Sequence, residues 1–141
     1  MFSILPTQIA YLVMFAVCGL ALAFGRRFER LVAVATVIAW LVTPLVHRAD
    51  NDLVQWGIFT VDLIYLLVLI GFAVFDRPLW ILFMASFQLL VVLTHVVFMT
   101  DMTLKQWAFF SAYYLWSDAQ LAALAVGVWQ AWWGQRRASR R

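Results

Sequence analysis

The sequence predicts an all-α membrane protein with five transmembrane helices. Of its 141 residues, 66% are hydrophobic and 12% are charged, whereas soluble domains average about 45–50% and about 25%. A chain this short cannot bury so many apolar residues, because a domain of about 150 residues still exposes roughly a third of its surface. Lipid is therefore the expected solvent, and residues 1–141 are expected to form a single integral membrane domain.

Five apolar stretches have about the length that a transmembrane helix needs, which is about 20 residues. Short polar segments at 25–30, 47–52, 76–78 and 100–106 separate them. The expected helices span about 6–24, 31–47, 53–75, 79–99 and 107–130, and a basic tail follows at 134–141. Connections this short leave no room for a soluble active site.

The basic residues predict the orientation of the chain. With the N-terminus outside, eight of the ten Lys and Arg residues lie in cytoplasmic segments, while Arg48 and Lys105 lie outside. The positive-inside rule favours this topology, so we expect a multi-pass protein of a bacterial-type inner (plasma) membrane with a cytoplasmic C-terminus. The arginine-rich tail is expected to attract anionic lipid. Nucleic-acid binding is not expected, because no aromatic residues are interleaved with these arginines.

The hydropathy pattern also contains an internal repeat. An ungapped shift of 51 residues aligns polar pairs such as Thr43 with Thr94 and Asp50 with Asp101. The second and third helices and the fourth and fifth helices then form two hairpins in parallel orientation, related by an axis along the membrane normal. This predicts a duplicated four-helix bundle with the first helix added. The duplication either only built the bundle or encloses a site between its halves.

Polar side chains interrupt the apolar spans. A central aspartate costs roughly 2.5–3.5 kcal/mol on insertion scales, so Asp62 and Asp118 are expected to face protein. A rise of about 1.5 Å per residue places Asp62 level with His95 and Asp118 level with Gln88. These pairs predict a polar pocket that opens outward and ends near mid-membrane. The candidate ligand- or proton-binding residues are Asp62, Gln88, His95, Tyr114, Ser117 and Asp118.

Two further positions bear on this pocket. Pro44 lacks an N–H and is expected to kink the second helix, leaving a carbonyl for Thr43 or water to satisfy; it is the candidate hinge. Haem ligation by His47 and His95 was considered and is not expected, since about two helical turns separate them in level. No metal site is predicted, and Cys18 is interpreted as a packing residue.

The predicted function is that of a carrier or sensor which binds a proton or a small ligand in this pocket. The sequence has no phosphate-binding glycine loop, C-x-x-C, H-E-x-x-H or G-x-S-x-G motif, so we do not expect an enzyme. The alternative is an accessory or assembly subunit of a larger membrane complex, whose polar groups only join helices at about 0.6 kcal/mol per hydrogen bond. A homo-oligomer or a larger complex is expected in either case.

Overall fold

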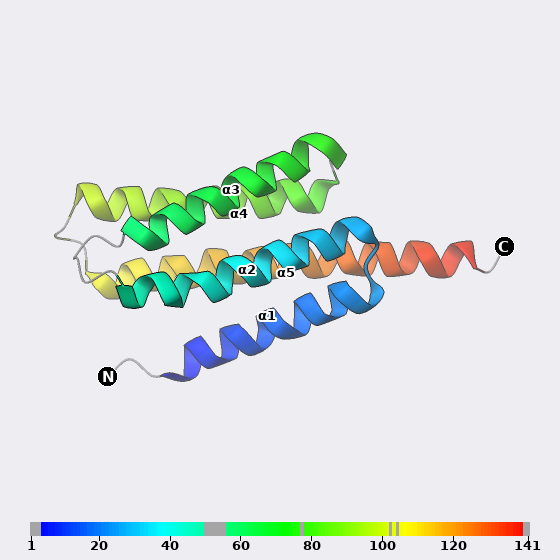
Figure 1. Ribbon diagram of the computed structural model, residues 1–141, viewed down its shortest axis with the longest axis horizontal. Coiled ribbons are helices and arrows are strands. Elements are labelled where there is room, and N and C mark those ends of the chain that lie inside the picture. The colour runs from blue at the N-terminus through cyan, green and yellow to red at the C-terminus, as the bar shows by residue number, and fades with distance from the viewer. Residues whose placement is uncertain (1–3, 50–55, 77, 102, 104, 140–141) are drawn as a thin grey trace.

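The computed structural model describes residues 4–49, 56–76, 78–101, 103 and 105–139, without the side chains of 4–7, 47–49, 76 and 106. Over this part of the chain it contains five helices and no strand, which confirms the all-α prediction. The helices are α1 (Ile4–Phe24), α2 (Arg27–Ala49), α3 (Trp56–Asp76), α4 (Leu79–Thr100) and α5 (Gln106–Ala138). They run up and down side by side, and α5 continues beyond the others (Figure 1).

The helices pack in a ring. Each helix from α1 to α4 contacts the next one along the chain, and α1 also packs against α5, while the direct contact between α2 and α5 is the smallest of those formed. The first helix is therefore an integral part of the bundle, placed between α2 and α5, and not an addition to a closed four-helix bundle. The predicted sequence duplication stays a prediction.

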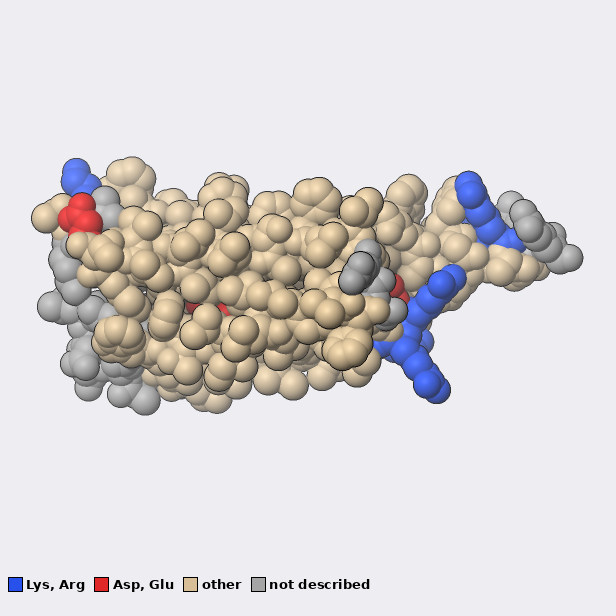
Figure 2. All heavy atoms as spheres, turned by 90° about the horizontal axis from the view of Figure 1, so that it is seen from above, with Lys and Arg blue, Asp and Glu red and all other residues tan. Residues whose placement is uncertain are grey.

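Among the residues whose side chains are described, three helices are long and apolar enough to cross a membrane, over 27–46, 56–75 and 79–100. In α1 the described side chains, 8–24, form an apolar but shorter stretch. Figure 2 shows Lys and Arg side chains at the two ends of the molecule, with a band almost free of charge between them on this face. These features are those of a membrane protein.

The two ends of the bundle differ in charge. Gln135 Nε2 of α5 donates to the carbonyl of Phe24 at the end of α1 (3.4 Å), so the arginines that start α2 and finish α5 lie close together. We call this the arginine end. At the opposite end, α2 and α4 finish and α3 and α5 begin (Figure 1); we call it the Lys105 end.

Helix α2 begins four residues before the predicted start at 31. The reason lies in its first turn, where Glu29 accepts a hydrogen bond from the backbone N–H of Arg26 (2.9 Å) and Arg30 Nε donates to the carbonyl of Gly25 (3.0 Å). Gly25 is required at this tight turn, because a Cβ there would lie 2.8 Å from Cβ of Glu29 and against the backbone of Ala21. Charged residues thus begin a helix that the hydropathy pattern starts later.

Helix α5 runs eight residues beyond the predicted end at 130. The guanidinium of Arg136 lies over the ring of Trp132 (3.8 Å to the centroid), and that of Arg137 lies over Trp133 (5.5 Å). Such cation–π contacts stabilise the last turns, as does the interaction of basic side chains with the C-terminal end of the helix dipole. Apolar length alone therefore underestimates this helix.

The connection from α4 to α5 is held by a local turn. Both the hydroxyl (2.6 Å) and the backbone N–H (3.0 Å) of Thr103 donate to Oδ1 of Asp101, directly after α4 ends. These two hydrogen bonds, the hydroxyl first, lower the pKa of the Asp101 carboxyl, because they stabilise its charged form.

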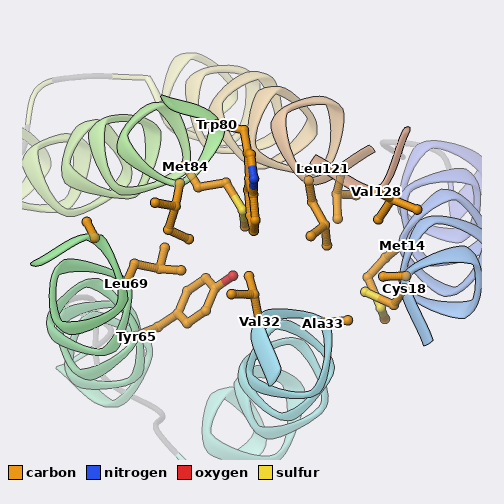
Figure 3. Close-up of a cluster of buried hydrophobic side chains, with 14 residues drawn as sticks. Met14, Cys18, Val32, Ala33, Tyr65, Leu69, Trp80, Met84, Leu121 and Val128 are labelled. Carbon is orange, nitrogen blue, oxygen red and sulfur yellow. The ribbon is translucent and has the colours of Figure 1, made fainter. Parts of the chain in front are cut away.

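The apolar core lies toward the arginine end and receives side chains from all five helices (Figure 3). The thiol of Cys18 is unpaired and buried there, as its interpretation as a packing residue requires. The hydroxyl of Tyr65 lies 2.7 Å from Oγ1 of Thr36, which links α3 to α2. The labelled core residues are Met14, Cys18, Val32, Ala33, Tyr65, Leu69, Trp80, Met84, Leu121 and Val128.

Candidate functional site

Four buried polar side chains form one hydrogen-bond network across α3, α4 and α5. His95 Nε2 lies 3.0 Å from Oδ2 of Asp62. Gln88 Nε2 donates to Oδ1 of Asp62 (3.1 Å) and to the Asp62 main-chain carbonyl (2.9 Å). Gln120 Nε2 then donates to Oε1 of Gln88 (2.7 Å). The pairing of Asp62 with His95, predicted from helix rise, is present in the structure.

Helix periodicity brings these groups together. Gln88 and His95 are two turns apart on α4 and therefore point in nearly the same direction, toward α3. Both belong to the buried stripe of α4. Asp62 is buried on α3 and Gln120 on α5, each on the side that faces α4. In this network Asp62 of α3 bonds both His95 and Gln88 of α4, and Gln120 joins α5 to Gln88.

Aromatic rings enclose the histidine. The ring centroid of His95 lies 5.1 Å from that of Phe109, 5.8 Å from that of Tyr113 and 6.1 Å from that of Phe59, all in edge-to-face arrangements. Such packing fixes the orientation of the imidazole and keeps its Nε2 directed at Asp62. The carboxylate and the imidazole are both almost completely buried, with exposed side-chain fractions of 9% and 3%.

Two adjoining cavities lie beside this network. The inner one has a volume of about 120 Å³. The outer one, of about 200 Å³, shares Tyr11, Thr43, Tyr113 and Tyr114 with it and extends past His95 toward the Lys105 end. The polar and aromatic walls of the inner cavity include Trp40, Asp62, Tyr65, Gln88, Ser117 and Gln120.

The lining gives the cavities a negative character. Among the described residues that line them there is no Lys or Arg, while Asp62 contributes a carboxylate. The tyrosine and tryptophan rings present negatively polarised faces. A proton, or a small ligand that is cationic or donates hydrogen bonds, fits this lining better than an anion does.

Pro44, which lines the outer cavity, changes the hydrogen bonding between α1 and α2 in a way that the sequence did not suggest. Helix α2 continues through Pro44 to Ala49, and Oγ1 of Thr43 donates to the carbonyl of Ala39 (2.9 Å). The carbonyl of Trp40, which loses its helical donor because of Pro44, accepts a hydrogen bond from the hydroxyl of Tyr11 (3.3 Å). The carbonyl that was expected to bond Thr43 or water is thus bonded by Tyr11 of α1. A gating role for Pro44 stays a prediction.

We expect Tyr11→Phe to lower the free energy of unfolding by about 1 kcal/mol, the usual contribution of one hydrogen bond. In a Pro44→Ala background the loss is expected to fall close to zero, because the restored N–H at position 44 then bonds the same carbonyl. A double-mutant cycle on detergent-solubilised protein measures this coupling. Equal losses in the two backgrounds would show that Tyr11 does not compensate for the proline.

The expected pairing of Asp118 with Gln88 is wrong. The Asp118 side chain is exposed on the outside of the bundle, and Gln88 bonds to Asp62 and Gln120 instead. Two residues along an α-helix change the side-chain direction by about 200°, so Asp118 and Gln120 point to opposite sides of α5. Ser111, Leu115 and Ala122, which lie on the same face of α5 as Asp118, are exposed as well.

Two of the remaining candidates line the cavities, and one lies outside the described residues. Ser117 is buried, lines the inner cavity and donates to the carbonyl of Tyr113 (2.8 Å). Tyr114 lines both cavities. The side chain of His47, considered with His95 for haem, lies outside the described residues. Among those that are described, no three His, Cys, Asp or Glu residues form a group suited to a metal ion.

Several residues of the site were not among the candidates. Gln120 is the one that the sequence indicates most clearly. It is a polar residue inside a span and lies three positions after Ser117, hence on the same face of α5. Tyr11, Tyr65 and Tyr113 gave no such signal, since a tyrosine in a membrane helix is equally typical of an interfacial or packing residue.

Comparisons with known proteins add no functional information to the geometry of the network and its cavities. No protein-family model matches the chain, and no curated protein or solved structure is detectably similar to it.

Proposed function

We propose that the protein is a small carrier or sensor that binds a proton or a small cationic, amine-like ligand in the cavity beside Asp62. The observation that carries this proposal is the position of the Asp62 carboxylate, which is buried inside the bundle, hydrogen-bonded by Gln88 and His95, and part of a cavity wall. Ionisable groups in membrane interiors typically mark ion, proton or ligand pathways.

The pair of Asp62 and His95 supports a proton-coupled mechanism. Imidazole is a common proton carrier in proteins, and His95 Nε2 lies 3.0 Å from the Asp62 carboxylate. When the imidazole is neutral, its Nε2–H donates to the carboxylate. One added proton cancels the negative charge of the pair. A cationic ligand beside Asp62 would then compete with that proton.

The proposed topology has all five helices in a bacterial-type inner (plasma) membrane, with the N-terminus and the cavity mouth outside. The clustering of Arg26, Arg27 and Arg30 with Arg136 and Arg137 at the arginine end supports a cytoplasmic location for that end. Arg77 lies outside the described residues. In this orientation the cavities extend toward the outer surface, and the arginines face the anionic cytoplasmic leaflet.

The test measures binding of ethylammonium, with ethanol as the uncharged probe of matched size, to the full-length protein in lipid nanodiscs. NMR of labelled histidine and calorimetry report binding over a range of pH. We expect ethylammonium to bind in preference to ethanol. While the proton competes, its affinity is expected to rise by up to about tenfold per pH unit, because one proton is released for each cation bound.

The chain offers a matched control for this experiment. Asp62→Asn removes the buried carboxylate with little change in volume, whereas Asp118→Asn makes the same chemical change on the outer face of α5. The first variant is expected to lose both the preference for ethylammonium and its pH dependence, and the second to keep them. Equal binding by wild type and Asp62→Asn, or equal losses in both variants, would refute the proposal.

A further inference from the structure

The Asp118 carboxylate is the most unusual group on the outside of the bundle. It is exposed on α5, although Ser117 and Gln120 beside it are buried. Among the described residues, none forms a hydrogen bond or an ion pair with it. Leu115 and Ala122, each about one turn away from it on α5, are exposed as well.

Its depth follows from the packing of α5. This helix runs along α4 (Figure 1), and Gln120 bonds Gln88 near the middle of α4. Because α4 is itself long and apolar enough to cross a membrane, Asp118 lies near the middle of the apolar band and far from either rim. A carboxylate at that depth faces acyl chains unless another molecule covers it, and intramembrane carboxylates pair with other polar or basic groups.

The positions of the Lys and Arg residues bear on which molecule can pair with this carboxylate. All ten Lys and Arg residues of the chain lie near the ends of its helices or between them, so a second copy has no cationic side chain at the depth of Asp118. The imidazole of His95, which lies within α4, is enclosed in the bundle. A two-fold dimer about this face would bring two Asp118 carboxylates together.

We propose that the α5 face around Asp118 binds a transmembrane helix of another membrane protein, one that carries a Lys or Arg at mid-membrane depth. A basic side chain supplies both the opposite charge and the hydrogen-bond donors that the carboxylate lacks. The small side chain of Ala122 allows the partner backbone to approach closely. This inference is independent of the proposed function, because Asp118 lines neither of the two cavities beside Asp62.

The experiment uses the full-length protein in phosphatidylcholine bilayers, with two leucine-rich transmembrane peptides as probes. One peptide carries a single central Lys and the other a Leu at the same position. Energy transfer between labelled protein and labelled peptide measures association. We expect the Lys peptide to associate about tenfold more tightly than the Leu peptide, as a buried polar contact between membrane helices allows.

Three variants identify the group responsible. Asp118→Asn is expected to abolish the preference for the Lys peptide, and Asp118→Glu to retain most of it. Asp62→Asn, which removes the interior carboxylate, is expected to leave the preference unchanged. Since Asp118 is on the surface, the two Asp118 variants should unfold at wild-type temperature, and unfolding of all three variants is measured in parallel. Equal association of both peptides with wild type would overturn the proposal, as would self-association of the protein that Asp118→Asn removes.

Discussion

Gln88→Leu is expected to lower the free energy of unfolding by about 2–4 kcal/mol, because three hydrogen bonds are lost together and one of them belongs to a buried carboxylate. The amide of Gln88 donates to Asp62 and accepts from Gln120. Its removal leaves the Gln120 amide and Oδ1 of Asp62 without these hydrogen-bond partners, because a leucine side chain neither donates nor accepts hydrogen bonds. The exposed fraction of Gln88 is 2%, so bulk water does not replace these contacts.

Reversible unfolding of the protein in mixed micelles measures this loss. Ser86→Ala is the matched control on the same helix, because the Ser86 hydroxyl is exposed and bonds the carbonyl of Leu82 in its own helix (2.8 Å). We expect this control to change stability by less than about 0.5 kcal/mol. A loss of similar size for Gln88→Leu would contradict the role of Gln88 as the centre of the network.

A variant with leucine at all four network positions addresses why the network exists. Breaking one member of a buried ionic cluster is costly, whereas replacing the whole cluster with apolar residues is often neutral or stabilising. If the fourfold variant recovers the stability lost in Gln88→Leu, the network is not needed for folding. That outcome would agree with a functional role for Asp62 and His95, because the chain then retains a polar cluster that its fold does not require.

The part of the site that the sequence predicts is the part determined within single helices. The depth of Asp62 and of His95 follows from helix rise, and the two residues meet at the same level. Gln88 was expected to pair with Asp118, and its partners are Asp62 and Gln120 instead. Level alone does not determine contact, because the direction of each side chain around its helix also decides which groups meet.

Asp118 shows why direction could not be determined for α5. Its sequence contains apolar and small residues on every face, so the hydrophobic pattern does not distinguish the inner stripe from the outer one. The expectation that Asp118 faces protein rested only on the cost of placing a carboxylate in lipid. Similarly, the hydrogen bond from Tyr11 to Trp40 joins two residues that are 29 positions apart in the chain. No local sequence pattern specifies which helix supplies the donor for a carbonyl that has lost its own donor to a proline.

Gly127→Ala is expected to destabilise the protein by about 1–3 kcal/mol, as overpacking of a tight core does. A Cβ at position 127 would lie 2.5–2.9 Å from ring atoms of Trp80. Trp80 itself is buried among core side chains of the other helices (Figure 3), so its ring cannot move aside without disturbing them. The contact between α4 and α5 that positions Gln120 against Gln88 therefore depends on a residue without a side chain.

Gly19→Ala is the matched control, because Gly19 also lies within a helix and a Cβ there meets nothing within 4 Å. Alanine is favoured over glycine inside helices by roughly 0.5–1 kcal/mol, so this variant should be neutral or slightly more stable. Adding Trp80→Phe to Gly127→Ala is expected to recover part of the loss, since the smaller ring makes room for the methyl group. Thermal unfolding is compared for wild type, Gly127→Ala, Trp80→Phe and the variant that carries both changes. If Trp80→Phe lowers stability by the same amount with either residue at 127, the close packing of α4 on α5 does not depend on this glycine.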